Sequence, residues 1–279
     1  MGKVAYHWND PRHSAFDNSP LRLAAIAGAD SFSYFITDPS GKPGAVKAFT
    51  IPRKYHFFDK PLGYLPKLIG DDDLLYADFD SVMLAVRGVP FAAMDPKYAN
   101  TSTMLEKLRA VTEISETDAL FCDVSDENFA VAFALPEIFV RETHAWFSDT
   151  QISHAMTALM TLSIKHSRNH SEPILFINIS SGLAEFVLCH DGLLLFANHY
   201  QVAGSEDVLY YTLAILQNLH VPQDQVVVRC AGQGAAMAIP VLQSYLKDVQ
   251  SFSDPEINVP ADFPLIDAAD LIFLTQCAS

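Results

Sequence analysis

The sequence predicts an α/β protein made of two lobes, each combining a mixed sheet with helices. Strand-like and helix-like segments alternate along the chain, and half of its 279 residues are hydrophobic, enough to bury a sizeable core. Both halves open with a strand and an antiparallel hairpin and then return through helices to further strands. This order indicates a duplicated α/β unit, with lobe I over residues 20–150 and lobe II over residues 151–279.

Lobe I is predicted to begin with a hairpin after an irregular start. Residues 21–38 alternate polar and apolar side chains, which is the period of a half-buried strand. The turn sequence Asp38-Pro39-Ser40-Gly41 then leads into a second strand over 45–51. The later elements are predicted to be strands over 81–86 and 90–94, a helix behind the capping box Thr103-Met-Leu-Glu106, strands over 119–124 and 129–135, and a helix over 136–147.

Lobe II is predicted to begin with a helix over 152–166. The solid apolar run at 174–179 is typical of a strand buried on both faces. Strands over 184–189 and 193–199 flank Asp191-Gly192, a strong hairpin signal. The remaining elements are predicted to be a helix from 204 or 205, a strand over 226–230, a helix over 234–249 and a short strand over 271–274.

The charge balance excludes several classes of partner. The chain has 18 Lys and Arg residues against 33 Asp and Glu residues, a net charge of −15. Duplex nucleic acids and anionic membranes are bound through basic side chains, so neither is an expected partner. No run approaches the ~18 apolar residues of a membrane span, and the start of the chain lacks an apolar signal core. We therefore expect a cytoplasmic protein whose four separated cysteines are buried thiols.

Three segments of the second half resemble the actin-like ATPase superfamily in their order and spacing. Phe176-Ile-Asn-Ile-Ser-Ser-Gly182 with its hairpin resembles the second phosphate loop. Gly204-Ser-Glu-Asp207 opens a helix where that superfamily usually has Gly-Gly-x-Asp. Val226-Val-Val-Arg-Cys-Ala-Gly-Gln-Gly234 resembles the adenosine-binding strand and its glycine turn. Each segment is common alone, and their succession is what makes the resemblance specific.

The whole chain is also similar, from about residue 20 to 275, to a bacterial family of unknown function that has this fold. The matching pieces are residues 21–38, Pro90-Phe-Ala-Ala-Met-Asp-Pro96, residues 130–136, Ile152-Ser-His-Ala155 and residues 198–213. The resemblance implies an actin-like fold of two ribonuclease H-like lobes with mixed sheets. It extends to the cytoplasmic actin-like proteins of pilus and secretion platforms, which work by holding protein partners.

The resemblance also implies a nucleotide site, and this chain departs from its pattern. The positions carried over are Asp30, Asn178, Ser180, Gly182, Gly204, Asp207, Gly232 and Gly234. Hydrolysis in the superfamily needs two Asp-x-Gly loops whose carboxylates hold hydrated magnesium. Asn178 and Ser180 stand where the second loop should have Asp and Gly, and the first loop, around Asp30, has no Asp-x-Gly register. The glycines of the adenosine turn are better preserved, but they are also what a tight turn would need without any ligand.

These departures predict a non-catalytic scaffold or regulatory binding protein with a degenerate nucleotide cleft and an unidentified protein partner. No catalytic residue and no metal site are expected, and ATP with magnesium is not expected to be hydrolysed. The alternative is a divergent ATP-binding protein or ATPase that uses Asp30, Asn178 and the turn at 232–234. Assembly into filaments is a third hypothesis, which the charge of −15 disfavours at low salt.

The histidines have plainer interpretations than metal binding. His166 and His170 are four residues apart, but the polar residues between them and the lack of a third ligand favour a solvated helix end. His154 lies in an apolar segment, which favours a hydrogen-bonded histidine of the core, with a role in the cleft as the alternative.

Two other patterns concern the surface. The acidic stretch at 71–80 lacks the glycine and final Glu of a calcium loop, so we expect a solvated loop, with an adaptor surface for a basic partner as the alternative. The pair Tyr210 and Tyr211 follows Asp207 on a predicted helix. One of the two tyrosines is expected to pack inward, which leaves the other for a contact surface.

Overall fold

The computed structural model describes residues 3–10, 20–52, 58, 72–254 and 257–276. The chain divides into two compact units, residues 1–157 with 274–279 and residues 158–273. We describe each unit by itself. That the two units are duplicated lobes, divided near residue 150, stays a prediction.

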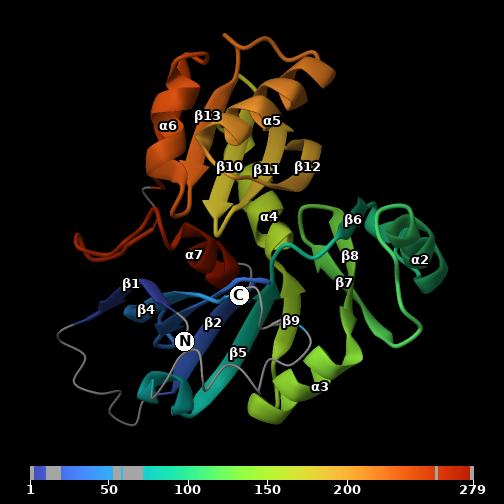
Figure 1. Ribbon diagram of the computed structural model, residues 1–279, viewed down its shortest axis with the longest axis vertical. Coiled ribbons are helices and arrows are strands. Elements are labelled where there is room, and N and C mark those ends of the chain that lie inside the picture. Colours follow the sequence, from blue (N-terminus) through green and yellow to red (C-terminus); the bar gives the residue numbers. More distant parts are fainter. Residues whose placement is uncertain (1–2, 11–19, 53–57, 59–71, 255–256, 277–279) are drawn as a thin grey trace. The chain divides into compact units, whose positions relative to one another are not determined.

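The first unit contains a six-stranded mixed sheet (Figure 1). From edge to edge its strands are β1 (Lys3–Asn9), β4 (Pro43–Thr50), β3 (Ser31–Thr37), β2 (Leu21–Ala27), β5 (Phe79–Val86) and β9 (Gln151–His154). The first four strands pair antiparallel, and β2, β5 and β9 pair parallel. Nearly every residue of β2 and β3 is buried, so this pair is the centre of the unit's core.

Three predictions about this sheet are wrong. Residues 21–38 form two strands, because Gly28 donates a backbone hydrogen bond to the carbonyl of Ser31 (2.8 Å) and the chain reverses there. The irregular start contains β1, which pairs with β4. The predicted helix over 152–166 begins as β9, because residues 151–154 extend the sheet beside β5, and only then continues as α4 (Ala155–Ser167).

A smaller antiparallel sheet completes the first unit. Its strands are β6 (Phe91–Met94), β8 (Phe129–Pro136) and β7 (Asp118–Ser125), and its helices are α2 (Thr101–Arg109) and α3 (Glu137–Trp146). Helix α2 begins at Thr101, before the predicted capping box, because the Asn100 side chain accepts a hydrogen bond from the Thr103 amide (3.1 Å). Leu108 of α2 is fully buried against β8. Val111 follows the end of this helix, and its side chain is exposed.

The second unit contains a five-stranded sheet. From edge to edge its strands are β12 (Leu193–Gln201), β11 (Leu183–His190), β10 (Ile174–Ser180), β13 (Val227–Ala231) and β14 (Asp248–Ser251). Strands β10 to β12 are antiparallel, whereas β13 and β14 run parallel to β10. The hairpin predicted at Asp191-Gly192 is confirmed, with positive φ angles of 49° and 74° at these residues.

One face of this sheet packs on two helices, α5 (Ser205–Asn218) and α6 (Ala235–Gln243). Alternate residues of β10, namely Leu175, Ile177 and Ile179, belong to this core. The intervening residues point to the opposite face, where the Phe176 ring lies 5.7 Å from the His166 ring of α4.

Two predicted elements at the end of the chain are wrong. The helix predicted over 234–249 ends at Gln243, and β14 follows, because Val249 pairs with Val228 and extends the parallel part of the sheet. The strand predicted over 271–274 is part of a helix, α7 (Ala269–Gln276). A short apolar run does not distinguish a strand from a buried helix by its period. None of the described helices has the length and apolar character that crossing a membrane requires.

Candidate functional site

Asn178 lies at one end of a row of polar side chains that crosses three strands of the second unit. It is 1% exposed, and its Nδ2 donates a hydrogen bond of 2.7 Å to Oε2 of Glu185. The two residues are directly opposite each other on β10 and β11, and Glu185 is directly opposite His199 on β12. Opposite residues in an antiparallel register point to the same face, so the three side chains form one row.

The charges in this row explain why position 178 holds an amide. Glu185 is 2% exposed, so its carboxylate depends on donors within the protein. Burial lowers the pKa of His199, and the neighbouring Glu185 charge opposes that shift. An Asp at position 178 would place a second carboxylate at hydrogen-bond distance from Glu185, where two negative charges repel strongly. The Asn178 amide donates a hydrogen bond there instead.

The oxygen atom of the Asn178 amide has a different environment from its nitrogen. Oδ1 of Asn178 is buried and has no hydrogen-bond partner within the described residues. It faces the glycine turn, since a Cβ added to Gly232 would lie 2.8 Å from it. The Asn178 amide therefore has a buried acceptor atom that no donor among the described residues uses.

The glycine turn is shaped by its contact with the end of β10. Gly232 has φ +84°, and a Cβ on it would overlap the backbone oxygen of Ile179. A Cβ on Gly234 would overlap the side chain of Ile179. The Gly234 amide donates to the carbonyl of Ile179 (3.1 Å), and the Gly232 amide donates to the carbonyl of Ile266 (2.8 Å). Packing within the unit thus accounts for both glycines and for both of their amide groups.

Ser180 and Gly182 belong to the turn between β10 and β11. Ser180 is buried at the end of β10 and lies opposite Leu183. Ser181 and Gly182 connect the strands with positive φ angles of 51° and 72°, which is the conformation of a tight two-residue hairpin. Gly182 suits this left-handed position, whereas Ser181 adopts it at a cost.

Gly204 and Asp207 form the start of α5. Gly204 is the N-cap residue, and a carboxylate oxygen of Asp207 accepts a hydrogen bond of 2.7 Å from the Ala203 amide. This bond satisfies a backbone donor just before the helix, and the acidic side chain in the first turn also favours the helix dipole. A helix-capping role is therefore sufficient to explain Asp207.

Asp30 lies in the first unit, apart in the chain from the other candidates. It occupies the turn between β2 and β3, where its carbonyl accepts a hydrogen bond of 2.6 Å from the Ile51 amide. Of the positions carried over from the resemblance, the structure brings Asn178, Gly232 and Gly234 into contact with one another through Ile179. Asp207 and Gly204 form a separate helix cap.

Sequence reasoning missed the partner of Asn178. Glu185 is the one charged residue of β11, within an otherwise apolar strand. A charged residue in the middle of an apolar strand is costly unless it is paired, and this is the signal that could have identified it. Ile266, whose carbonyl holds the Gly232 amide, carries no such signal, because any residue has a backbone carbonyl.

Two predictions about histidines are now decided by geometry. His154 is fully buried, its Nε2 lies 2.9 Å from the carbonyl oxygen of Val89, and its Nδ1 accepts a hydrogen bond from the Met156 amide. The prediction of a hydrogen-bonded core histidine is confirmed. The predicted solvated position of His166 is wrong, because its Nε2 lies 3.2 Å from Asp254 Oδ2. No group of three or more metal-ligating side chains occurs within the residues that the structure describes.

Two predictions about the surface have different outcomes. Tyr211 packs inward, with its ring stacked 4.2 Å from that of Tyr200, and Tyr210 is 66% exposed, as predicted for the pair. Asp72 of the acidic stretch is buried, because it accepts hydrogen bonds from Tyr34 and Lys47, so this position is not solvated. Asp73, Asp78 and Asp80 are exposed.

The predicted buried thiols are confirmed at two positions. Cys189 and Cys230 are buried, and burial raises the pKa of each thiol to about 12. Cys122 is half-buried. Cys277 lies outside the described residues. A thiol with so high a pKa is poorly nucleophilic at neutral pH, so neither buried cysteine suits covalent catalysis.

Comparison with known proteins identifies the fold. A family model described as Protein of unknown function (DUF3822) matches residues 16–249. A crystal structure of a Bacteroides thetaiotaomicron protein with actin-like ATPase fold and unknown function matches with a TM-score of 0.76 and 14% identity, covering 93% of this chain and 96% of that one. No curated protein matches the sequence.

Two further solved structures have the same architecture. The PilM–PilN type IV pilus biogenesis complex matches with a TM-score of 0.64 and 10% identity, covering 91% of this chain and 97% of that one. The ethanolamine utilization protein EutJ from Carboxydothermus hydrogenoformans matches with a TM-score of 0.51 and 9% identity, covering 92% and 91%. At such low identities the matches show the fold alone: the chain has an actin-like ATPase fold.

Proposed function

We propose, from the premise that this chain belongs to the family described as Protein of unknown function (DUF3822), that it is a non-catalytic scaffold or regulatory binding protein. In this proposal it is a cytoplasmic protein that holds a protein partner, and its nucleotide site has lost the groups that hydrolysis needs. The observation that carries the proposal is the hydrogen bond between Asn178 and Glu185.

That hydrogen bond uses the side chain on which a magnesium site would depend. Magnesium is held in phosphate-binding sites by one or two carboxylates, directly or through water. At position 178 the side chain is a neutral amide, and its NH₂ group is bonded to a buried carboxylate. The Glu185 carboxylate accepts the hydrogen bond from this amide, and its negative charge also acts on His199. The carboxylate therefore already has two interactions within the unit.

The glycine turn supports the same proposal. Nucleotide-binding turns present free backbone amides to phosphate oxygens. Here the Gly232 amide is bonded to Ile266, and the Gly234 amide is bonded to Ile179. A phosphate would have to displace the Ile266 and Ile179 carbonyls from these two amides. Its binding would therefore add no hydrogen bonds to the turn, because each new bond would replace an existing one.

Partner binding is proposed from the kind of protein that shares the fold. The PilM–PilN type IV pilus biogenesis complex is an assembly in which a protein of similar fold is held with a partner. This chain carries a formal net charge of −15, which would speed encounter with a basic partner.

A titration with nucleotides tests the proposal directly. Calorimetry with ATP, ADP and a non-hydrolysable ATP analogue, each with magnesium, is expected to show no saturable heat at protein concentrations of tens of micromolar. Micromolar binding that is lost in Asn178→Ala and kept in Asn198→Ala, a matched change on β12, would overturn the scaffold proposal. The melting temperature of each variant, measured in parallel, confirms that it is folded.

The second candidate is a divergent ATP-binding protein, and one observation favours it. Oδ1 of Asn178 is a buried acceptor that no donor in the described residues satisfies, and it points toward the glycine turn. Such an atom could accept a hydrogen bond from a magnesium-bound water molecule. The same titration distinguishes this candidate, because it requires saturable binding that depends on magnesium.

A further inference from the structure

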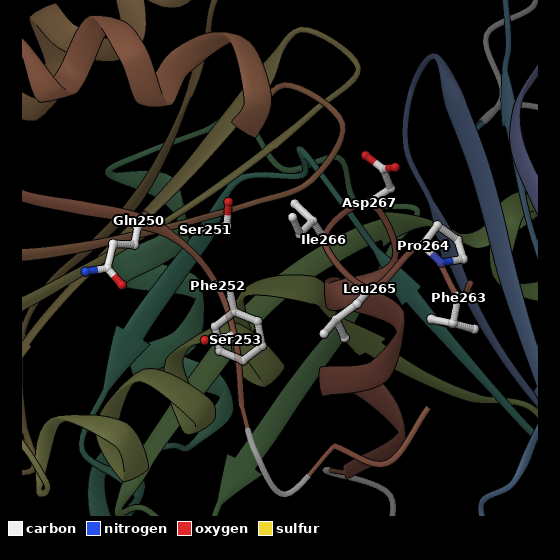
Figure 2. A pocket seen from close by; sticks show the side chains of 9 residues that line it. All are labelled: Gln250, Ser251, Phe252, Ser253, Phe263, Pro264, Leu265, Ile266 and Asp267. Atoms are coloured by element: carbon white, nitrogen blue, oxygen red, sulfur yellow. The ribbon is translucent and has the colours of Figure 1, made fainter. Parts of the chain in front are cut away.

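A pocket of about 610 Å³ lies within the second unit, and of the residues discussed so far Ile266 lines it. Two segments line it, 250–253 at the end of β14 and 263–267 before α7 (Figure 2). Its volume is in the range of about 300–1,000 Å³ that is typical of small-molecule sites. None of the positions carried over from the nucleotide-binding resemblance lines it.

Aromatic and aliphatic side chains form the base of the pocket. Phe252 is 2% exposed and Phe263 is 6% exposed, and both belong to the core of the unit. Leu265 lies between these two rings in Figure 2 and is half-buried. Beside it Ile266 is 37% exposed, a large apolar side chain that the fold leaves partly uncovered. The pocket can therefore cover an apolar body.

The walls are held by backbone hydrogen bonds. The Phe252 amide donates to the carbonyl of Cys230 on β13 (2.8 Å), and the carbonyl of Ile266 accepts from the Gly232 amide (2.8 Å). The first segment is thus attached to β13, and the second is attached to the glycine turn that follows this strand. A wall fixed in this way needs little ordering when a ligand binds.

The residues that line the pocket include one acidic side chain, Asp267. No donor within the described residues forms a hydrogen bond or ion pair with the half-buried side chain of Asp267, and burial together with the nearby Asp270 charge raises the pKa of this group. The two neighbouring carboxylates are engaged: Asp270 accepts from the Leu271 amide (2.7 Å), and Asp254 lies 3.2 Å from His166. Asp267 alone is left at the edge of an apolar surface.

We propose that this pocket binds a free organic cation, with its ammonium or guanidinium group at Asp267 and its apolar body over Leu265 and Ile266. The cation would supply the donors that Asp267 lacks and would relieve its repulsion with Asp270. The same charges repel an anionic ligand, so nucleotides and phosphates do not suit this pocket. The inference does not rest on the scaffold proposal, since it concerns different residues and a ligand of opposite charge.

Three probes with one apolar body and different charges test this inference on the full chain. We expect 4-phenylbutylamine to bind saturably in ligand-observed NMR and calorimetry, 4-phenylbutanol to bind at least about tenfold more weakly, and 4-phenylbutyrate not to bind. Equal affinity of the amine and the alcohol, or no saturable binding of the amine, would overturn the proposal.

Matched variants locate the cation. Asp267→Asn is expected to weaken binding of the amine about tenfold and leave the alcohol unchanged, whereas Asp262→Asn, an exposed acidic position in the same segment, should change neither. Leu265→Gln should weaken the amine and the alcohol alike, and unlike a change at buried Phe252 it is expected to leave the fold intact. Unchanged amine affinity in Asp267→Asn would contradict the assignment.

A measurement with a peptide probe distinguishes a free ligand from a side chain of a partner protein. We expect acetyl-Phe-Arg-amide, which carries the same two chemical groups on a peptide backbone, to bind more weakly than 4-phenylbutylamine. If the peptide binds at least about tenfold more tightly, and Asp267→Asn removes that binding, the free-cation assignment is wrong and the pocket receives a basic side chain of a protein.

Discussion

Asn178 Nδ2 donates a hydrogen bond of 2.7 Å to Glu185 Oε2, across two neighbouring strands and out of contact with solvent. This bond links two facts that look unrelated in the sequence, an amide where the fold usually has a carboxylate and a charged residue inside an apolar strand. The amide and the carboxylate are complementary, so neither position can change alone without loss.

Exchanging the two groups tests this complementarity. Asn178→Asp should destabilise the protein by about 3 kcal/mol at neutral pH, because it places two carboxylates side by side in the interior. The double variant Asn178→Asp with Glu185→Gln restores one amide and one carboxylate and should recover most of that loss. Urea unfolding of the wild type, both single variants and the double variant measures the coupling. An Asn178→Asp protein as stable as the wild type would refute the account.

Gly232 is expected to be required by close contact as well as by its backbone angle. Gly232 and Gly41 have almost the same φ, +84° and +83°, but a Cβ on Gly41 meets nothing within 4 Å whereas one on Gly232 overlaps Ile179. We therefore expect Gly41→Ala to cost about 1 kcal/mol from backbone strain alone and Gly232→Ala to cost about 3 kcal/mol or more. Thermal unfolding compares the two. Equal losses would mean that the turn relaxes around the added methyl group.

The paired tyrosines are expected to differ sharply in their contribution to stability. Tyr211 stacks on Tyr200 with ring centroids 4.2 Å apart and an interplanar angle of 4°, while Tyr210 is 66% exposed. Tyr211→Ala should cost about 2 kcal/mol, and Tyr210→Ala should change the free energy of unfolding by less than about 0.5 kcal/mol. Chemical denaturation of both variants is the measurement. A loss of stability in Tyr210→Ala as large as that in Tyr211→Ala would contradict the prediction that the exposed Tyr210 ring contributes little.

The half-buried His199 should make the protein less stable in mild acid. Because burial lowers its pKa in the folded state, the unfolded chain binds the proton more readily as the pH falls below the ordinary histidine value of about 6.5. This contribution to stability is therefore present at pH 7 and is lost toward pH 5. His199→Gln should flatten the decline in the free energy of unfolding over this window, while His144→Gln, at an exposed position on α3, should leave it unchanged. Identical pH profiles for all three proteins would contradict the prediction.

Much of the fold could be predicted because its signals are local. The hairpin at Asp191-Gly192 depends on two residues that tolerate positive φ, and the apolar run of β10 depends on burial of both faces. The errors occur where a segment has no strong local preference. Residues 152–154 and 249–251 form strands because they pair with the edges of β5 and β13.

The candidate site could be predicted less completely. The sequence alone showed that Asn178 and Ser180 depart from the pattern of a phosphate loop, since this needs only the identity of the residues. The sequence did not show which residues contact Asn178 and the glycine turn. Glu185 meets Asn178 through strand register, and Ile266 meets Gly232 through a contact of residues 34 positions apart (266 − 232).

The sequence by itself determined the class of fold, most of its strands and hairpins, and the presence of Asn178 and Ser180 in place of an Asp-x-Gly pattern, because each follows from residue type and local period. Only the tertiary structure decided which contacts these residues make: the Asn178 amide donates a hydrogen bond to a buried carboxylate, Ile179 leaves room only for glycines in the turn, and Asp267 lies beside an apolar pocket. These depend on distances between segments far apart in the chain, and no local pattern contains them.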